Sequence, residues 1–127
     1  MSDMLSSIRN AAMAKKPEIE VLYSKDCENV AKVLKARGFL TDLKVFKLKG
    51  KVFKMMNIKL AHDDGVYRIS KIKRVSKLGK RVYKGYADLH PITSGLGVQV
   101  VSTSKGVMDG LIAKKKKLGG EIVCEVY

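Results

Sequence analysis

The sequence predicts an α/β protein of the α+β kind, built as two small packed domains. Three observations support this. The chain has 127 residues, which suffice for one domain or for two halves of about 60 residues. Apolar residues recur at helical spacing in two segments before Gly38 and mainly at alternating spacing from Leu43 onward. A single further helical segment then precedes a closing strand. We expect an N-terminal α-β-α-β-β domain over residues 1–65 and a mainly antiparallel, one-helix domain over residues 66–127.

Two helices with a strand between them are predicted near the N-terminus. Asp3 is a suitable N-cap, and apolar residues at three- and four-residue steps indicate a helix as far as Lys15. Glu18–Tyr23 alternates and predicts a strand. Ser24 is a natural N-cap for the second helix, because its hydroxyl can accept from an unpaired backbone N–H. The buried stripe of that helix is expected to comprise Cys27, Val30, Ala31 and Leu34.

The middle of the chain predicts a lysine-rich hairpin. Leu43–Lys49 and Lys51–His62 flank Gly50 and read as its two strands. The alternation is not strict, because adjacent apolar pairs occur at 45–46 and 55–56. These pairs indicate either a β-bulge or a sheet that is partly apolar on both faces.

Further strands are expected beyond the hairpin. The Asp63-Asp64-Gly65 segment predicts a turn. Strands are then predicted over Val66–Val75 and Lys80–Lys84, and a loop over Asp88–Gly97. The run Val98–Thr103 is rich in β-branched residues and predicts a buried strand.

The C-terminal part is predicted to contain a helix and a last strand. Ser104 is expected to cap a helix from Lys105 to Lys117, which the glycines at 119–120 would end. Glu121–Tyr127 predicts the closing strand. Its residues Ile122, Cys124 and Val126 are expected on one face.

The positive charge is concentrated in one third of the chain. The formal net charge is +14, and residues 44–84 hold fourteen Lys or Arg against two acidic residues. A local block of this kind is typical of a protein with a polyanionic partner. The block predicts strands rather than an amphipathic helix with an apolar face, so nucleic acid is favoured and no membrane partner is expected.

Three consecutive hydroxyls, Ser102–Ser104, lie between a predicted buried strand and a predicted helix, and Lys105 follows them. A helix N-terminus exposes unpaired N–H groups and a positive dipole end, so this segment suits a phosphate or a sugar hydroxyl. The alternative is that Ser104 only caps the helix. Tyr83 lies in a basic strand, where it could stack on an unpaired base or serve as half-buried sheet packing.

No catalytic, metal or cofactor set is recognisable. His62 and His90 have no neighbours at metal-ligand spacing, and Cys27 and Cys124 are the only cysteines. We therefore expect no catalytic residues, no metal and no cofactor.

Five motifs occur in order from end to end of the chain. They are D-M-L-x-x-I-R-N (Asp3–Asn10), R-V-S-x-x-G-x-R-V-Y-K (Arg74–Lys84), G-L-G-V (Gly95–Val98), S-T-S-K-G-V-M (Ser102–Met108) and L-G-G-E-I (Leu118–Ile122). Together they resemble the bacterial-type small-subunit ribosomal protein eight family. The C-terminal pair is the most specific.

The resemblance implies a structural protein of the small ribosomal subunit that is not an enzyme. It would bind the central domain of small-subunit ribosomal RNA directly, at an irregular stem, and help to assemble it. The residues implied in RNA binding are Ser102, Thr103, Ser104, Lys105, Tyr83, Arg81, Gly120 and Glu121 from the C-terminal domain, with Arg9, Asn10, Ser24 and Lys25 from the N-terminal domain.

The resemblance also implies further partners and a location. Neighbouring small-subunit proteins, such as ribosomal protein five, and the protein's own messenger are expected partners. The expected location is the cytoplasmic ribosome of a bacterium or the ribosome of an organelle. Two alternatives stay open: a basic protein that binds nucleic acid without sequence preference, and a small phosphotransfer or hydrolytic enzyme that uses the segment at Ser104.

Overall fold

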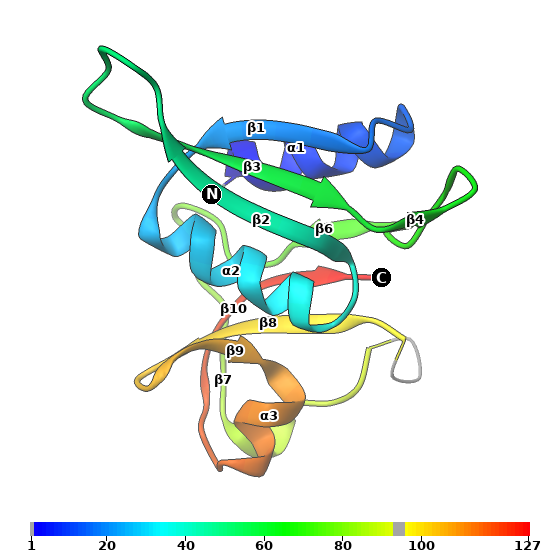
Figure 1. Ribbon diagram of the computed structural model, residues 1–127. Coiled ribbons are helices and arrows are strands. Elements are labelled where there is room, and N and C mark those ends of the chain that lie inside the picture. Colours follow the sequence, from blue (N-terminus) through cyan, green and yellow to red (C-terminus); the bar gives the residue numbers. More distant parts are fainter. Residues whose placement is uncertain (1, 93–95) are drawn as a thin grey trace. The chain divides into compact units, whose positions relative to one another are not determined.

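The computed structural model describes residues 2–92 and 96–127 (Figure 1). The chain divides into two compact units, Met1–Ser70 and Lys71–Tyr127; the boundary expected from the sequence lies after Gly65. Helices and antiparallel sheets occur together, which confirms the α+β class. Part of the loop expected at Asp88–Gly97 lies outside the described residues.

The first unit is a three-stranded antiparallel sheet with two helices. Its elements are α1 (Ser2–Met13), β1 (Glu18–Leu22), α2 (Lys25–Ala36), β2 (Leu40–Lys47), β3 (Lys54–Leu60), β4 (His62–Asp63) and β5 (Val66–Tyr67). The strand order is β1-β3-β2, while β4 and β5 form a separate short hairpin. The central strand buries Met56, Ile58 and Leu60, and α1 and α2 pack against β1 and β2 respectively.

The second helix forms for the reasons that the sequence indicates, whereas Asp3 is wrong as the N-cap of the first, because α1 begins at Ser2 and Asp3 lies in its first turn. The buried residues of α2 are Cys27, Val30, Ala31 and Leu34, as predicted. Ser24 caps this helix, and its Oγ accepts a hydrogen bond from the backbone N–H of Cys27 at 3.1 Å. A hydroxyl in this position stabilises a helix by about 0.5–2 kcal/mol relative to alanine. The cap therefore fixes where β1 ends and α2 begins.

The sheet of the first unit has apolar residues on both faces. Val45 lies opposite Met56, and Phe46 lies opposite Met55. Neighbouring residues of a strand point to opposite faces, so each adjacent pair supplies both sides of the sheet. The register irregularity falls elsewhere, around Thr41. The adjacent apolar pairs at 45–46 and 55–56 therefore reflect a sheet with two apolar faces and not a β-bulge.

Three of the predicted strands are too long: Lys80–Lys84 is reduced to β7 (Tyr83–Lys84), and each of the other two is divided. Lys51–His62 is divided into β3 and β4, and Val66–Val75 is divided into β5 and β6 (Ile72–Arg74). The second division lies where the chain passes from one unit to the other, after Ser70. The alternation of apolar and polar residues continues through this point in the sequence. However, β5 pairs with β4, whereas β6 pairs with the last strand, β10 (Gly120–Val126).

The second unit is a five-stranded antiparallel sheet with one short α-helix. Its elements are β6 (Ile72–Arg74), β7 (Tyr83–Lys84), the 3-10 turn η1 (Tyr86–Asp88), β8 (Val98–Thr103), β9 (Gly106–Asp109), α3 (Gly110–Lys115) and β10 (Gly120–Val126). The order is β6-β10-β8-β9, and β7 pairs with β10 beyond the end of β6. A core of Leu89, Val101, Ala113 and Ile122 lies between this sheet and α3.

The prediction of a helix from Lys105 to Lys117, capped by Ser104, is wrong. The chain turns back at Thr103–Gly106 and forms β9, which pairs with β8. Gly106 has a φ of +117°, which favours glycine and suits a tight turn. The helix begins only at Gly110, where the Asp109 carboxylate accepts from the Leu111 N–H at 2.9 Å. Asp109 is an effective cap, and the β-branched Val107 fits the hairpin.

The expectation that Ile122, Cys124 and Val126 share a face is also wrong for Ile122. Ile122 pairs with Val101, but Cys124 pairs with Val100, so β10 contains one extra residue between them. Since Val100 and Val101 point to opposite faces, Ile122 and Cys124 do as well. The bulge lets β10 bury apolar side chains on both faces.

The glycines at 119–120 do not end the helix. The helix ends near Lys116, and Lys117 has a φ of 57°. A Cβ on Gly119 would meet the Lys84 carbonyl oxygen, and one on Gly120 would meet that of Ser102. Both glycines instead allow the backbone at the start of β10 to approach the neighbouring strands closely.

We therefore expect Gly120→Ala to lower the free energy of unfolding by about 1–3 kcal/mol, the usual cost of overpacking. Urea unfolding of the intact chain measures this change. Gly85→Ala is the matched control, because a Cβ at Gly85 meets nothing within 4 Å and its φ is −72°. Equal stability of the two variants would contradict the close approach.

The Cys124 thiol is expected to be inert in the folded protein. Burial raises its pKa to about 12, although nearby Arg74 acts in the opposite direction. At pH 8 the reactive thiolate is then roughly one part in 10⁴. In a Cys27→Ser background, iodoacetamide at pH 8 should leave Cys124 unmodified until urea unfolds the chain. Modification of the native protein within minutes would contradict this.

Candidate nucleic-acid interface

Three of the predicted site residues form one row across the sheet of the second unit. Glu121 in β10 lies directly opposite Tyr83 in β7 and Ser102 in β8. Side chains directly opposite in antiparallel strands lie on the same face, about 5 Å apart at Cβ. The next β10 residue, Ile122, points into the core under α3. The polar row of Tyr83, Glu121 and Ser102 therefore lies on the face opposite α3.

A tight turn lies at one end of this row. The Thr103 Oγ1 donates a hydrogen bond to the Gly106 carbonyl oxygen at 2.8 Å and accepts one from the Lys105 N–H at 3.1 Å. The Thr103 hydroxyl thus holds the turn, which we call the hydroxyl turn (Thr103–Gly106). Ser104 and Lys105 are exposed on it. Among the described residues, the side-chain hydroxyls of Ser102 and Ser104 have no hydrogen-bond partner.

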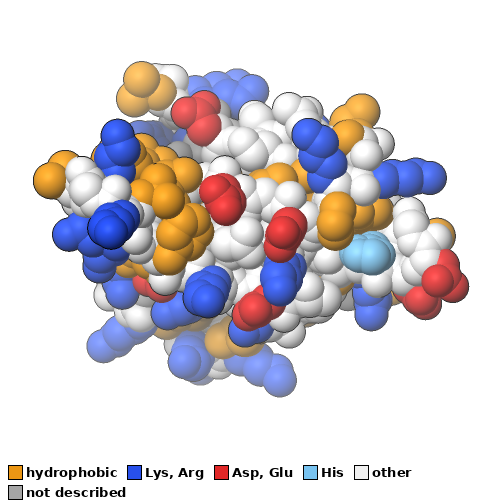
Figure 2. Space-filling model, turned by 45° about the horizontal axis from the view of Figure 1, so that its top comes forward, with side chains coloured by type: hydrophobic (Ala, Val, Ile, Leu, Met, Phe, Trp, Pro, Cys, Tyr) orange, Lys and Arg blue, Asp and Glu red, His pale blue; other side chains and the backbone are white. Residues whose placement is uncertain are grey.

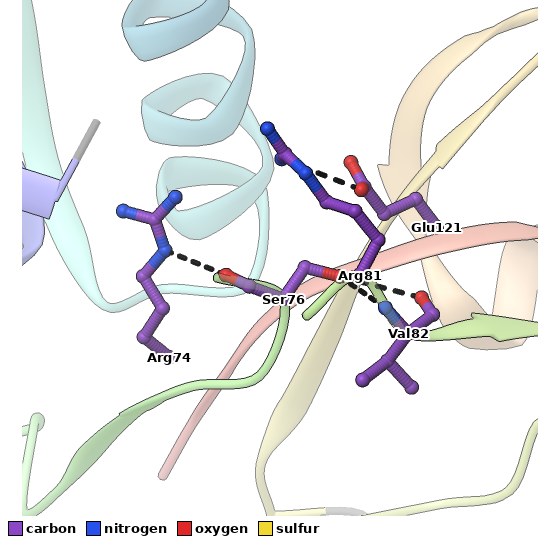
Figure 3. Close-up of polar contacts among 5 residues, drawn as sticks. All are labelled: Arg74, Ser76, Arg81, Val82 and Glu121. Atoms are coloured by element: carbon purple, nitrogen blue, oxygen red, sulfur yellow. Dashed lines mark hydrogen bonds and ion pairs between the residues drawn. The ribbon is translucent and has the colours of Figure 1, made fainter. Parts of the chain in front are cut away.

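The Glu121 carboxylate forms an ion pair with Arg81, another of the predicted site residues. Arg81 Nη1 lies 3.4 Å from Glu121 Oε2 (Figure 3), and both side chains are partly exposed. The arginine reduces the repulsion between this carboxylate and a phosphate backbone. The second carboxylate oxygen can still accept from a base amino group or a ribose hydroxyl.

A residue that the sequence analysis did not single out positions Arg81. Ser76 is buried, and its Oγ accepts from the Val82 N–H at 2.9 Å and donates to the Val82 carbonyl at 3.3 Å. Its own carbonyl accepts from Arg74 Nε at 2.8 Å (Figure 3). Ser76 thereby closes the loop that carries Arg81. In the sequence, the one sign of this role is that Ser76 belongs to the R-V-S motif.

The Tyr83 ring is available to a ligand. Tyr83 is 69% exposed, so the half-buried packing role considered for it is wrong. Gly120 lies beside the row, between Lys84 and Thr103, and its missing side chain allows the strands to approach. The structure thus brings together all eight site residues predicted for this unit.

The four remaining predicted site residues belong to the first unit. Arg9 and Asn10 lie on α1, and Asn10 is exposed. Ser24 is the N-cap of α2, and the exposed Lys25 forms an ion pair with Glu28 at 3.7 Å. The Ser24 oxygen accepts a bond in the cap, which leaves its proton free to donate.

The charge of the second unit suits a polyanion. Residues 71–127 contain twelve Lys or Arg against four Asp or Glu. Across the described parts of the chain, no group of three or more His, Cys, Asp or Glu could hold a metal ion. None of the helices over residues 2–92 and 96–127 is long and apolar enough to cross a membrane.

Comparison with known proteins places these features in a family. The model of ribosomal protein S8 matches residues 1–127. Relatives named small ribosomal subunit protein uS8 include one from Alcanivorax borkumensis, 41% identical over 99% of this chain and 95% of the relative. Another, from Legionella pneumophila strain Lens, is 44% identical over the same shares. A third, from Oleidesulfovibrio alaskensis, is 40% identical over 100% of this chain and 96% of the relative. On this evidence, the chain belongs to the ribosomal protein S8 family.

Proposed function

We propose that this protein is a structural constituent of the small ribosomal subunit and binds the central domain of small-subunit ribosomal RNA through the polar row and the hydroxyl turn. The observation that carries the proposal is that several groups suited to RNA binding lie together on one face of the sheet. An exposed aromatic ring, a carboxylate paired with arginine and two unpaired hydroxyls lie beside a lysine. The family shows the general function, and this geometry supports the choice of residues.

The chemistry of the row fits irregular RNA better than a perfect duplex. The major groove of A-form RNA is too deep and narrow for side chains to read, whereas unstacked bases and ribose hydroxyls in an internal loop are accessible. In the proposed complex the Tyr83 ring stacks on an unpaired base or a ribose. Ser102 and Ser104 donate to or accept from base edges and 2′-hydroxyls, and Lys105 neutralises a phosphate.

A second, smaller contact is proposed for the first unit. Asn10 and Lys25 are exposed, and Lys25 carries the charge that a phosphate requires. Arg9 and Ser24 complete the set implied by the family resemblance. Ser24 would donate its free proton while its oxygen stays in the helix cap.

Further partners and the location are part of the same proposal. They are a neighbouring small-subunit protein such as ribosomal protein five and the protein's own messenger, which would offer a similar stem. The relatives described above come from bacteria, which favours the cytoplasmic ribosome of a bacterium over an organelle.

A competition titration tests the function. The protein is titrated against the irregular central-domain RNA stem, with a perfect duplex of equal length as competitor, at near-physiological salt. We expect at least a hundredfold preference for the irregular stem, because non-specific phosphate contacts are the same in both. Equal binding would contradict the proposal and favour a basic protein without sequence preference.

Ser102→Ala combined with Ser104→Ala should weaken binding to the irregular stem by about 1–3 kcal/mol for each polar contact left unpaired. The same titration measures this. Binding to the duplex should not change, since no hydroxyl reads it. Ser70→Ala, at an exposed serine of the first unit, is the matched control. An equal loss on both RNAs would show that the hydroxyls do not read structure.

Tyr83→Ala should weaken binding to the irregular stem by about 1–3 kcal/mol, the usual value for one stacked base. Tyr83→Phe should keep most of the affinity, since it keeps the ring. The ring is exposed, so neither change should alter the urea midpoint appreciably. If the Ala and Phe variants bind alike, Tyr83 does not stack on RNA.

A further inference from the structure

The first unit contains a pocket beside its short β4–β5 hairpin. Residues from the segments 38–41, 61–63 and 66–68 line a space of about 420 Å³. This volume is within the range of small-molecule sites. On the side where Figure 1 draws β4, Figure 2 shows a histidine side chain beside hydrophobic side chains, with acidic and basic side chains near them. None of the lining residues is among those predicted to bind RNA, so the pocket is a separate feature.

A β-bulge in β2 forms one side of the pocket. Between Leu40 and Asp42 the pairing of β2 with β3 shifts by one residue, so Thr41 is an extra residue in β2. Bulges commonly redirect a side chain toward a site. The Thr41 Oγ1 lines the pocket and donates to the Lys59 carbonyl oxygen at 3.3 Å. Its lone pairs therefore stay available to accept a hydrogen bond.

A change of strand partner at Ala61 forms the other side. The Ala61 N–H donates to the Phe39 carbonyl oxygen at 3.0 Å, whereas the Ala61 carbonyl accepts from the Arg68 N–H at 3.1 Å. The chain that follows β3 thus leaves β2 at this residue and continues as the β4–β5 hairpin. Leu40 and Ala61 are both buried, and they supply the apolar part of the lining where the two strands separate.

Two opposite charges without partners lie at this pocket. Asp63 is opposite Val66 in the hairpin, and the hydrogen bond from Arg68 places that residue opposite Ala61. Alternation along the two strands puts Asp63 and Arg68 on one face, as diagonal neighbours. They form no ion pair with each other, and within residues 2–92 and 96–127 no other side chain pairs with either. Both charges are therefore available to a ligand.

A stacked pair of rings holds the hairpin that carries these charges. His62 lies opposite Tyr67, with ring centroids 5.0 Å apart and an interplanar angle of 26°. Cross-strand aromatic pairs of this kind stabilise a hairpin in one register. The register in turn sets the spacing between Asp63 and Arg68, so the two charges are presented together.

We propose that this pocket binds the zwitterion of a free α-amino acid with an aliphatic side chain. Its ammonium group would donate to the Asp63 carboxylate and to the Thr41 Oγ1. Its carboxylate would accept two parallel hydrogen bonds from the Arg68 guanidinium, whose planar fork matches that geometry. The aliphatic side chain would lie against Leu40 and Val66 and remove apolar surface from water.

The pair of charges selects this class of ligand over others. A simple anion such as phosphate would pair with Arg68 but would be repelled by Asp63. A simple cation such as a polyamine would meet the reverse situation. A zwitterion satisfies both groups at once, and its short distance between opposite charges suits two diagonal neighbours on one hairpin face.

A titration of the intact chain, followed by the shifts of its backbone amides in ¹H–¹⁵N spectra, tests the proposal. L-leucine should produce saturable shifts at Gly38, Ala61 and Arg68, with a Kd in the millimolar range that is usual for a ligand of so few atoms. L-leucinamide lacks the carboxylate, and N-acetyl-L-leucine lacks the ammonium group. Each should bind about threefold to tenfold more weakly than L-leucine. Shifts that do not saturate, or equal affinity for the three compounds, would overturn the proposal.

The net charge of the protein makes this order informative. At a formal net charge of +14, unspecific attraction would favour the anionic N-acetyl-L-leucine over the neutral zwitterion. A preference for L-leucine therefore requires a group that recognises the ammonium. Glycine carries the same zwitterion without an aliphatic side chain and should bind more weakly than L-leucine. Equal binding of glycine would contradict the apolar part of the site.

Two variants assign the recognition to individual residues. Arg68→Gln should remove the preference for L-leucine over L-leucinamide and keep the preference over N-acetyl-L-leucine. Asp63→Asn should do the reverse. Asp64→Asn is the matched control, because Asp64 is adjacent and exposed but does not line the pocket. An equal effect of the control, or variants that keep both preferences, would overturn the assignment. Either failure leaves the proposed RNA contact untouched, because the two sites share no residue.

Discussion

The pairing of β10 with its neighbours is the constraint on which the second unit depends. This one strand pairs with β8 along one edge and with both β6 and β7 along the other. Gly119 and Gly120 allow it to approach Lys84 and Ser102 more closely than a side chain would permit. The bulge after Ile122 then turns its apolar residues to both faces. Without this close pairing, Glu121 would not lie between Tyr83 and Ser102.

Elements fixed by local patterns could be predicted from the sequence. The buried stripe of α2 and the Ser24 cap depend only on neighbours within one or two turns of helix. The end of β8 could not be predicted in the same way. A hydroxyl before a lysine suits a helix start and a hairpin turn alike, and the choice depends on whether Val107 pairs with Ser102. That pairing requires a sheet edge, which local patterns do not reveal.

The candidate site was partly predictable for the same reason. Family-like motifs indicated Tyr83, Glu121 and Ser102 as members of one candidate site, but not the row that they form. The Arg81–Glu121 pair joins residues forty positions apart and depends on strand register. Likewise, the adjacent apolar pairs of the hairpin indicated either a bulge or two apolar faces, and only the register shows that Leu22, Met55 and Phe46 meet on the face opposite Met56.

The Ser76 hydroxyl closes its loop at the base rather than at the tip. Above the two hydrogen bonds to Val82, the loop carries only the small Lys77–Lys80 bridge, and Leu78 is 92% exposed. The Lys77–Lys80 bridge lies between Leu78 and Arg81, so two backbone hydrogen bonds separate changes of length at Leu78 from Arg81. The tip of this loop is accordingly a position where a fluorophore or an affinity tag can be attached without disturbing the polar row.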